Sequence, residues 1–129
     1  MKEILLEIDE EAAKEFLIKA LENSKFHFLK RIFDHVSNIE FRDNEIRFKV
    51  LMFKYYLKLK TYPRTLTGKY EFFHNIPAKM IKKEELPKFV ELNDKTIVIN
   101  ILENPISRNI SIEKFEIENG KLKLILGLN

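Results

Sequence analysis

The sequence has no cysteine, no tryptophan and only three glycines among its 129 residues. Without a thiol, the chain cannot form disulfide bonds, use a thiolate nucleophile or bind cysteine-ligated zinc or iron–sulfur clusters. Gly68, Gly120 and Gly127 lie too far apart for a phosphate-binding loop, which excludes nucleotide binding of the P-loop or Rossmann kind. No apolar run reaches the roughly 20 residues of a membrane-spanning helix. The first apolar run stops at Glu7, so we expect no signal peptide and a cytoplasmic protein.

The composition is typical of one globular domain over residues 1–129. Hydrophobic residues make up 45% and charged residues 33%, with 23 basic and 20 acidic residues and a net charge of +3. Such a chain can bury a core, unlike the weakly hydrophobic sequences that stay disordered. No repeat, low-complexity tract or linker divides it. Abundant Lys, Glu and Ile are typical of a thermophilic source.

The N-terminal part of the chain is predicted to form a strand and then helical structure. Ile4, Leu6 and Ile8 alternate with other residues as in a strand. Asp9 is a suitable N-cap, and the two glutamates after it lie where the helix dipole favours negative charge. Apolar residues then continue at helical spacing, so residues 10–36 are predicted to form one helix or a helix pair.

Two hairpins are predicted from their turn signals. Closure at Asp43-Asn44 pairs Arg42 with Glu45, Phe41 with Ile46, Glu40 with Arg47, and Ile39 with Phe48. Closure at Asn119-Gly120 pairs Glu118 with Lys121, Ile117 with Leu122, Glu116 with Lys123, and Phe115 with Leu124. In both hairpins one face is then wholly apolar, while opposite charges face each other on the other.

The remaining pattern predicts strands at 45–60, 67–74 and 95–102, and a short helix or turn within 79–91. The apolar positions change parity twice, near Leu51 to Phe53 and again between Ile112 and Phe115. A regular strand cannot exchange its faces, so each change predicts a bulge or a sharp bend. Two bent strands predict a sheet that curls. The expected fold class is therefore α+β, with the N-terminal helix or helix pair packed on a strongly curved antiparallel β-sheet.

Basic residues concentrate in the middle of the chain, where residues 41–80 hold nine basic and three acidic side chains. The candidate basic patch is Lys49, Lys54, Lys58, Lys60, Arg64 and Lys69, with Tyr56 and Tyr70 nearby. Lysines interleaved with tyrosines can follow phosphates and stack bases, as in single-stranded nucleic-acid binding. The same lysines could meet anionic lipid headgroups. They could also simply solvate the outer face of a strand or protect it from edge pairing.

No group of residues predicts catalysis, a cofactor or a metal site. His27, His35 and His74 have no spacing typical of metal ligands. His74 could act as a base beside Glu71, but no nucleophile or oxyanion donor accompanies them. We therefore expect a protein that is not an enzyme.

The C-terminal third carries a recognisable order of features. Leu86-Pro87 precedes a short connector, Thr96–Leu102 alternates as a strand, and Ile110–Ile117 leads to the Asn119-Gly120 turn and Lys121-Leu122. With this order, the stretch Leu86–Asn129 resembles the closing part of bacterial members of the tubular lipid-binding superfamily. The resemblance implies a curved antiparallel sheet that wraps a long helix and holds an acyl chain.

The leading hypothesis is a non-catalytic binding module with an apolar groove for a lipid-like ligand or a partner's apolar segment. The candidate groove residues are Phe48, Met52, Phe53, Tyr55, Phe72, Phe115 and Leu124. Each of them could equally be plain core, since a chain of this length has little spare apolar surface. The alternatives are single-stranded nucleic-acid binding through the basic 47–69 segment, and a structural subunit of an oligomer with an exposed sheet edge or an aromatic patch as its interface.

Overall fold

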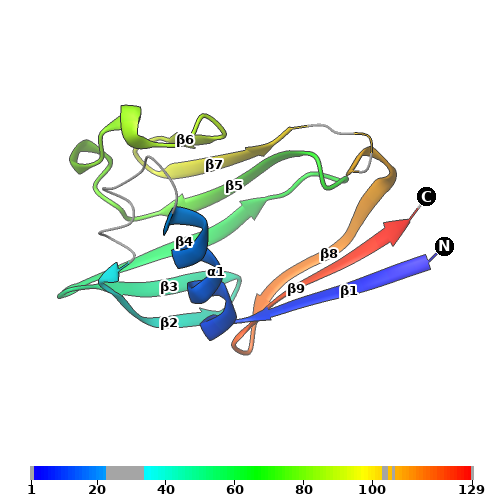
Figure 1. Ribbon diagram of the computed structural model, residues 1–129, viewed down its shortest axis with the longest axis horizontal. Helices are drawn as coiled ribbons and strands as arrows, with labels where there is room; N and C mark the ends of the chain where they lie inside the picture. Colours follow the sequence, from blue (N-terminus) through cyan, green and yellow to red (C-terminus); the bar gives the residue numbers. More distant parts are fainter. Residues whose placement is uncertain (1, 23–33, 103–104, 106, 129) are drawn as a thin grey trace.

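The computed structural model describes residues 2–22, 34–102, 105 and 107–128. They form two antiparallel sheets, one with strand order β1-β9-β8 and the other with order β2-β3-β4-β5-β7-β6 (Figure 1). The first sheet contains β1 (Lys2–Asp9), β8 (Ile110–Glu118) and β9 (Lys121–Leu128). The second contains β2 (Val36–Arg42), β3 (Glu45–Val50), β4 (Phe53–Thr61), β5 (Gly68–His74), β6 (Val90–Leu92) and β7 (Thr96–Ile101). The described helix is α1 (Glu10–Glu22), with short 3-10 turns at Ala78–Met80, Lys83–Glu85 and Ser107–Asn109.

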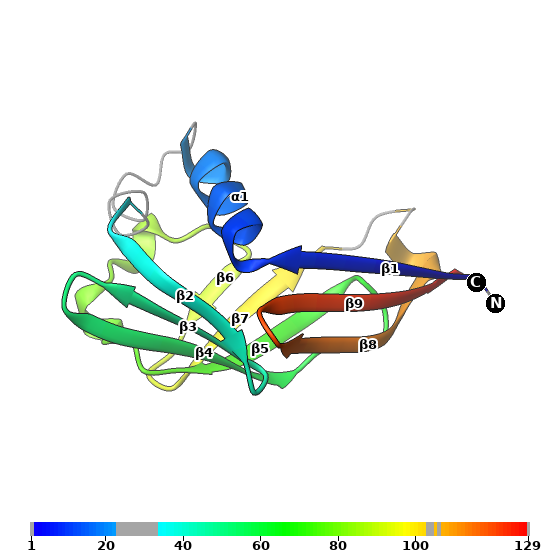
Figure 2. The ribbon, with the colours of Figure 1, turned by 90° about the horizontal axis from the view of Figure 1, so that it is seen from below.

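The expected α+β fold with one strongly curved sheet is wrong, because the chain is mostly β and neither sheet is strongly curled (Figure 2). The parity change near Leu51 is a chain reversal and not a bend. Val50 pairs with Phe53, so Leu51 and Met52 form a two-residue hairpin turn between β3 and β4. When a chain reverses over two residues, the same face of the sheet takes even positions before the turn and odd positions after it. The strand predicted over 45–60 is therefore two strands.

The second parity change is a bulge, as predicted. The pairing of β8 with β9 shifts register between Ile112 and Lys114, which leaves Glu113 as the extra residue. A bulge adds local twist and bends the strand that carries it. This one bulge moves Phe115 and Ile117 onto the face occupied by Ile112, but it does not roll the sheet into a tube.

Both predicted hairpin turns are confirmed. The Asn119-Gly120 hairpin has the whole predicted register. The Asp43-Asn44 hairpin has it as far as the pair of Glu40 with Arg47. The predicted pair of Ile39 with Phe48 is wrong, since the register shifts between Ser37 and Glu40, where Asn38 has a φ of 53°. Both turns have positive φ at their two central residues, a conformation that favours Asn, Asp and Gly.

The predicted first strand and the predicted N-cap at Asp9 are confirmed. The strand is β1, and the Ala12 amide donates a hydrogen bond to Asp9 Oδ1 at 2.7 Å, so Asp9 caps α1. The prediction of helical structure up to residue 36 is wrong at its C-terminal end, because Val36 is the first residue of β2 and is buried there. The rest of that prediction, over 23–33, lies outside the described residues.

Residues 68–74 and 96–101 form strands near the predicted positions. The predicted short turns within 79–91 are present, but Val90–Leu92 pairs with β7 as an edge strand.

The core lies where the two sheets meet. Its buried members are Phe41, Tyr70, Phe72, Ile112, Ile117 and Leu126, with Ala13 of α1 packed against them. Two hydrogen bonds join the hairpin turns, from the Asn44 amide to the Ile117 carbonyl at 2.9 Å and from the Gly120 amide to the Phe41 carbonyl at 2.8 Å. These bonds fix the two sheets against each other on one side of the core.

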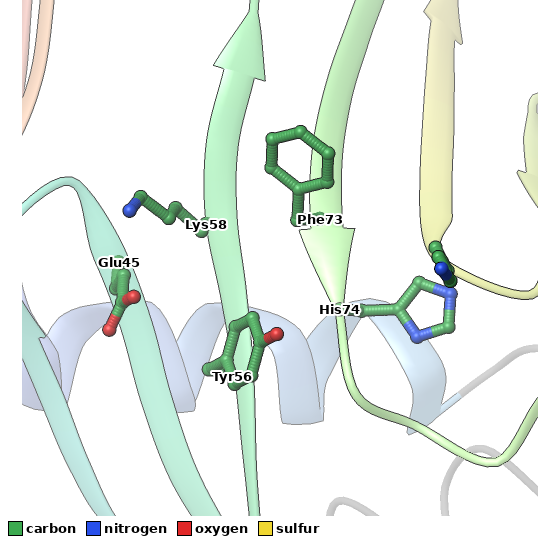
Figure 3. A pocket seen from close by; sticks show the side chains of 6 residues that line it. Glu45, Tyr56, Lys58, Phe73 and His74 are labelled. Carbon is green, nitrogen blue, oxygen red and sulfur yellow. The ribbon is translucent and has the colours of Figure 1, made fainter.

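The six-stranded sheet has two chemically different faces. The inner face carries the buried Phe41, Tyr70 and Phe72 and packs on the core. The outer face carries the alternate residues of the same strands, among them Arg47, Lys54 and Lys58. Helix α1 lies on the side opposite the outer face (Figure 3).

Candidate functional site

The residues predicted to line a groove separate into two places. Phe72 is 6% exposed in the core, and Phe115 and Leu124 pack against that core. Phe48, Met52, Phe53 and Tyr55 gather instead at the end of the β3–β4 hairpin. The structure therefore brings the seven residues together as two separate groups, one in the core and one at the hairpin end.

The hairpin end is an apolar projection with a row of rings behind it. We call the set Phe48, Val50, Leu51, Met52, Phe53 and Tyr55 the apolar hairpin end. Val50 pairs with Phe53, and Phe48 pairs with Tyr55 on the same face. The ring of Tyr55 lies 5.9 Å from that of Phe48 and 6.4 Å from that of Phe53, centroid to centroid. Aromatic rings at such distances stabilise one another, so the row is a preformed surface.

The tip of this projection is unusually exposed for apolar side chains. Leu51 is 64% exposed, Met52 is 87% exposed and Phe53 is 64% exposed. Leu51 also has a φ of 57°, a left-handed conformation that costs a non-glycine residue about 1 kcal/mol. Neither the exposure nor the strain helps the chain fold. Contiguous exposed apolar side chains of this kind are typical of a binding surface.

Two lysines form the pair directly behind the tip. Lys49 and Lys54 are opposite each other on the outer face, one pair further from the turn than Val50 and Phe53. Directly opposed side chains have Cβ atoms about 5 Å apart, and like charges there repel. In the described part of the chain, no carboxylate forms an ion pair with either lysine. A bound anion would relieve this repulsion.

The outer face continues this basic character along the sheet. Lys58 and Lys69 are exposed on it, and Lys60 binds Glu71 at 2.9 Å while its Nζ lies 5.3 Å from the centre of the Phe73 ring. Glu45, at 2.6 Å from Arg47, raises the pKa of that guanidinium through their hydrogen bond.

Two predicted members of the basic patch lie elsewhere. The Arg64 carbonyl accepts a hydrogen bond from the Ile112 amide at 2.7 Å, which places Arg64 beside β8. Tyr70 is in the core, where burial raises its pKa and its hydroxyl donates to the Leu66 carbonyl at 2.8 Å.

An open hollow of about 510 Å³ lies on the outer face (Figure 3). It is lined by Glu45, Tyr56, Lys58, Phe73, His74 and Lys95. Tyr56 comes from β4, Phe73 from β5, and His74 points away from Tyr56 toward the start of β7. Strand parity in the sequence puts Tyr56 on the same face as Lys58. Phe73 and Lys95 give no such signal, because only the pairing of β4 with β5 and of β5 with β7 brings them there.

His74 has a structural role, because both of its ring nitrogens bind backbone groups. Nδ1 accepts a hydrogen bond from the Ile76 amide at 3.0 Å, so Nε2 carries the proton and donates to the Asn93 carbonyl at 2.7 Å. The residue is 5% exposed. Glu71, its suggested partner, instead binds Lys60 at 2.9 Å. His74 and Glu71 therefore do not form the acid–base pair considered above.

Replacing His74 with alanine is expected to lower the free energy of unfolding by about 2–3 kcal/mol, because it removes a buried ring and two hydrogen bonds to backbone groups. Urea denaturation measures the change. Lys95→Ala is the control, since Lys95 lines the same hollow but is exposed, and its change should stay within about 0.5 kcal/mol. Equal losses for the two variants would contradict the structural role of His74.

Comparisons with known proteins find no matching family model, no matching curated protein and no matching solved structure. Within the described residues, no helix is long and apolar enough to span a membrane. Over the same residues, no three histidine or carboxylate side chains are grouped to hold a metal ion. The apolar hairpin end and the basic outer face are thus the two surfaces from which a function can be inferred.

Proposed function

We propose that this protein is a non-catalytic binding module that attaches to a lipid surface through its apolar hairpin end. The observation that carries the proposal is the exposure of Leu51, Met52 and Phe53 at the tip. Fully burying a side chain of this kind is worth about 1.5–3 kcal/mol. Three of them supply several kcal/mol, which is enough for reversible attachment and too little for permanent insertion.

The position of the lysines supports an anionic lipid as the ligand. Successive pairs along a strand are about 3.3 Å apart, so Lys49 and Lys54 stand just behind the tip. When the tip enters the acyl region, both ammonium groups reach the headgroup layer. A lysine near an anionic membrane surface contributes about 1 kcal/mol. The apolar tip thus matches the acyl layer of a lipid surface, and the lysine pair behind it matches the anionic headgroup layer.

Sedimentation with vesicles tests this function. The protein should sediment with vesicles that contain phosphatidylglycerol, and much less with vesicles of phosphatidylcholine alone. Added salt should weaken the attachment, because it screens the lysines, but an apolar contribution should remain. Equal amounts of protein in the pellet with and without vesicles would contradict the proposal. If the apolar hairpin end binds another protein and not lipid, vesicles will likewise leave the amount of protein in the pellet unchanged, and the proposal of lipid attachment is wrong.

A second candidate function is single-stranded nucleic-acid binding on the outer face of the six-stranded sheet. Tyr56 and Phe73 both line the hollow there, together with Lys58. In the described residues, Lys54, Lys58 and Lys69 form no ion pair. Aromatic rings that stack bases between lysines that meet phosphates are the usual elements of such a surface.

The nucleic-acid candidate predicts a definite salt dependence. Each phosphate contact on a single strand contributes about 0.7 to the slope of log K against log salt. Replacing Lys58 and Lys69 with glutamine should therefore reduce that slope by about 1.4. Fluorescence anisotropy of a labelled oligonucleotide measures it, with Lys114→Gln on β8 as the control that should change nothing. Wild-type protein that leaves the anisotropy unchanged at low salt would exclude this candidate.

A further inference from the structure

Strand β1 has an edge with no partner in the described part of the chain. It pairs with β9 over its whole length, from Lys2 opposite Leu128 to Asp9 opposite Lys121. Figure 2 shows β9 on one side of β1 and no described strand on the other. In an antiparallel strand, alternate residues direct their backbone N–H and C=O groups to opposite sides. Half of the backbone groups of β1 therefore face this free edge.

This edge has charged residues toward its two ends but lacks the other usual protection against pairing. Protected edges are short, or carry proline, bulges or charged side chains. Strand β1 has eight residues without proline, and its pairing with β9 has no bulge. On the outer side of this sheet, Glu7 lies 3.5 Å from Lys121 and 3.6 Å from Lys123, so two lysines already balance its charge. The edge is thus able to accept another strand.

The side chains of β1 are also apolar and exposed. Ile4, Leu6 and Ile8 share the face that continues the core side of the sheet, and they are 41%, 46% and 40% exposed. Leu5, on the opposite face, is 57% exposed. An added strand would cover the edge and extend the apolar face at the same time.

We infer that the added strand is β1 of a second copy of this chain, paired antiparallel about a two-fold axis at Leu6. The residues Ile4, Leu6 and Ile8 read the same in both directions about Leu6. A two-fold axis perpendicular to the sheet leaves every side chain on the face that it already occupies. Because opposed residues of two antiparallel strands lie on the same face, their two numbers must be both even or both odd. Pairing about Leu6 sets Ile4 opposite Ile8 of the other copy, and Leu6 opposite Leu6. The two three-stranded sheets become one continuous sheet.

Apolar matching favours this register over the one centred on Leu5. Pairing about Leu6 sets each of Ile4, Leu6 and Ile8 opposite a residue of the same set, so the apolar face stays continuous across the two copies. Pairing about Leu5 would set Ile8 opposite Lys2 and interrupt that face. Each register opposes one like-charged pair, Glu3 with Asp9 or Glu3 with Glu7, so charge does not choose between them.

The oligomeric state of the full chain gives the first test. Sedimentation equilibrium should show a dimer that dissociates on dilution. Leu6→Lys sets two ammonium groups opposite each other and should raise the dissociation constant at least about tenfold. Leu5→Lys is the matched control, because it sets the new ammonium opposite Glu7 and should leave the dimer intact or tighten it. A monomer at every concentration, or equal weakening by both changes, would overturn the inference.

A crosslink tests the register directly, since the chain has no cysteine of its own. Opposed residues in an antiparallel pair have Cα atoms about 4.5–5.5 Å apart, which a disulfide can bridge. Under mild oxidation, Leu6→Cys should give a crosslinked dimer, while Leu5→Cys should remain a single chain. A dimer from Leu5→Cys alone, or equal crosslinking of both, would overturn the pairing about Leu6. The measurement does not depend on lipid, so it fails or succeeds independently of the proposed function.

Discussion

Replacing Met52 and Phe53 together with aspartate will lower the affinity for anionic vesicles at least about a hundredfold. The two side chains are 87% and 64% exposed at the tip, and their transfer into lipid is worth about 3–6 kcal/mol in sum. A hundredfold change in affinity corresponds to about 2.7 kcal/mol. The new carboxylates also repel anionic headgroups. Vesicle sedimentation over a range of lipid concentrations measures the change.

The matched control places the same substitutions on exposed apolar residues elsewhere. Phe89 is 51% exposed and Leu102 is 74% exposed, and neither belongs to the apolar hairpin end. Changing both to aspartate should leave vesicle binding unaltered. Met52 and Phe53 lie outside the core, and the loss of the stacking of Phe53 on Tyr55 should cost about 0.5–1.5 kcal/mol in urea denaturation, so the variant stays folded. Equal vesicle binding by the hairpin variant and the wild type would remove the proposed role of the tip.

Replacing Ile117 with alanine is expected to give the largest loss of stability, about 4 kcal/mol. The Ile117 side chain is completely buried in the core where the two sheets meet. Its amide donates to Asn44 Oδ1 at 3.3 Å, and its carbonyl accepts from the Asn44 amide at 2.9 Å. These backbone bonds hold the position in place, so the surroundings cannot collapse into the space that the side chain leaves.

Urea denaturation measures this loss, and Ile101→Ala is the control. Ile101 lies at the end of β7 and is 39% exposed, so removing the same atoms should cost much less there. Equal losses at positions 117 and 101 would contradict the description of the core. A wild-type-like stability of Ile117→Ala would do the same.

The local turns were predictable from the sequence because their conformation depends on the residues that form them. Asp43, Asn44 and Asn119 tolerate a positive φ, and the register next to each turn follows from pairing apolar residues with apolar ones, as far as Glu40 in the first hairpin. The Leu51-Met52 turn gives no such signal, since leucine is disfavoured at a φ of 57°. The parity change there therefore predicts a bulge or a sharp bend in one strand, and the expectation of a strongly curved sheet follows from that error.

The candidate site was predictable only where it lies on a single strand. The alternation of Lys54, Tyr56 and Lys58 placed them on one face before any pairing was known. Their meeting with Phe73 and Lys95 depends on the order of β4, β5 and β7, which nonlocal packing decides. Sequence composition also could not separate core aromatic residues from exposed ones. Phe72 and Phe53 have the same side chain, yet one is 6% exposed and the other 64%.

The most direct test of lipid attachment uses the absence of tryptophan from the chain. Phe53→Trp places a single indole at the tip, and Tyr62→Trp places one beyond the opposite end of β4, where Tyr62 stacks on Phe115. On addition of vesicles containing phosphatidylglycerol, the emission of the tryptophan at position 53 should shift to shorter wavelength, while that at position 62 stays unchanged. Unchanged emission at position 53, or an equal shift at both positions, would contradict insertion of the apolar hairpin end.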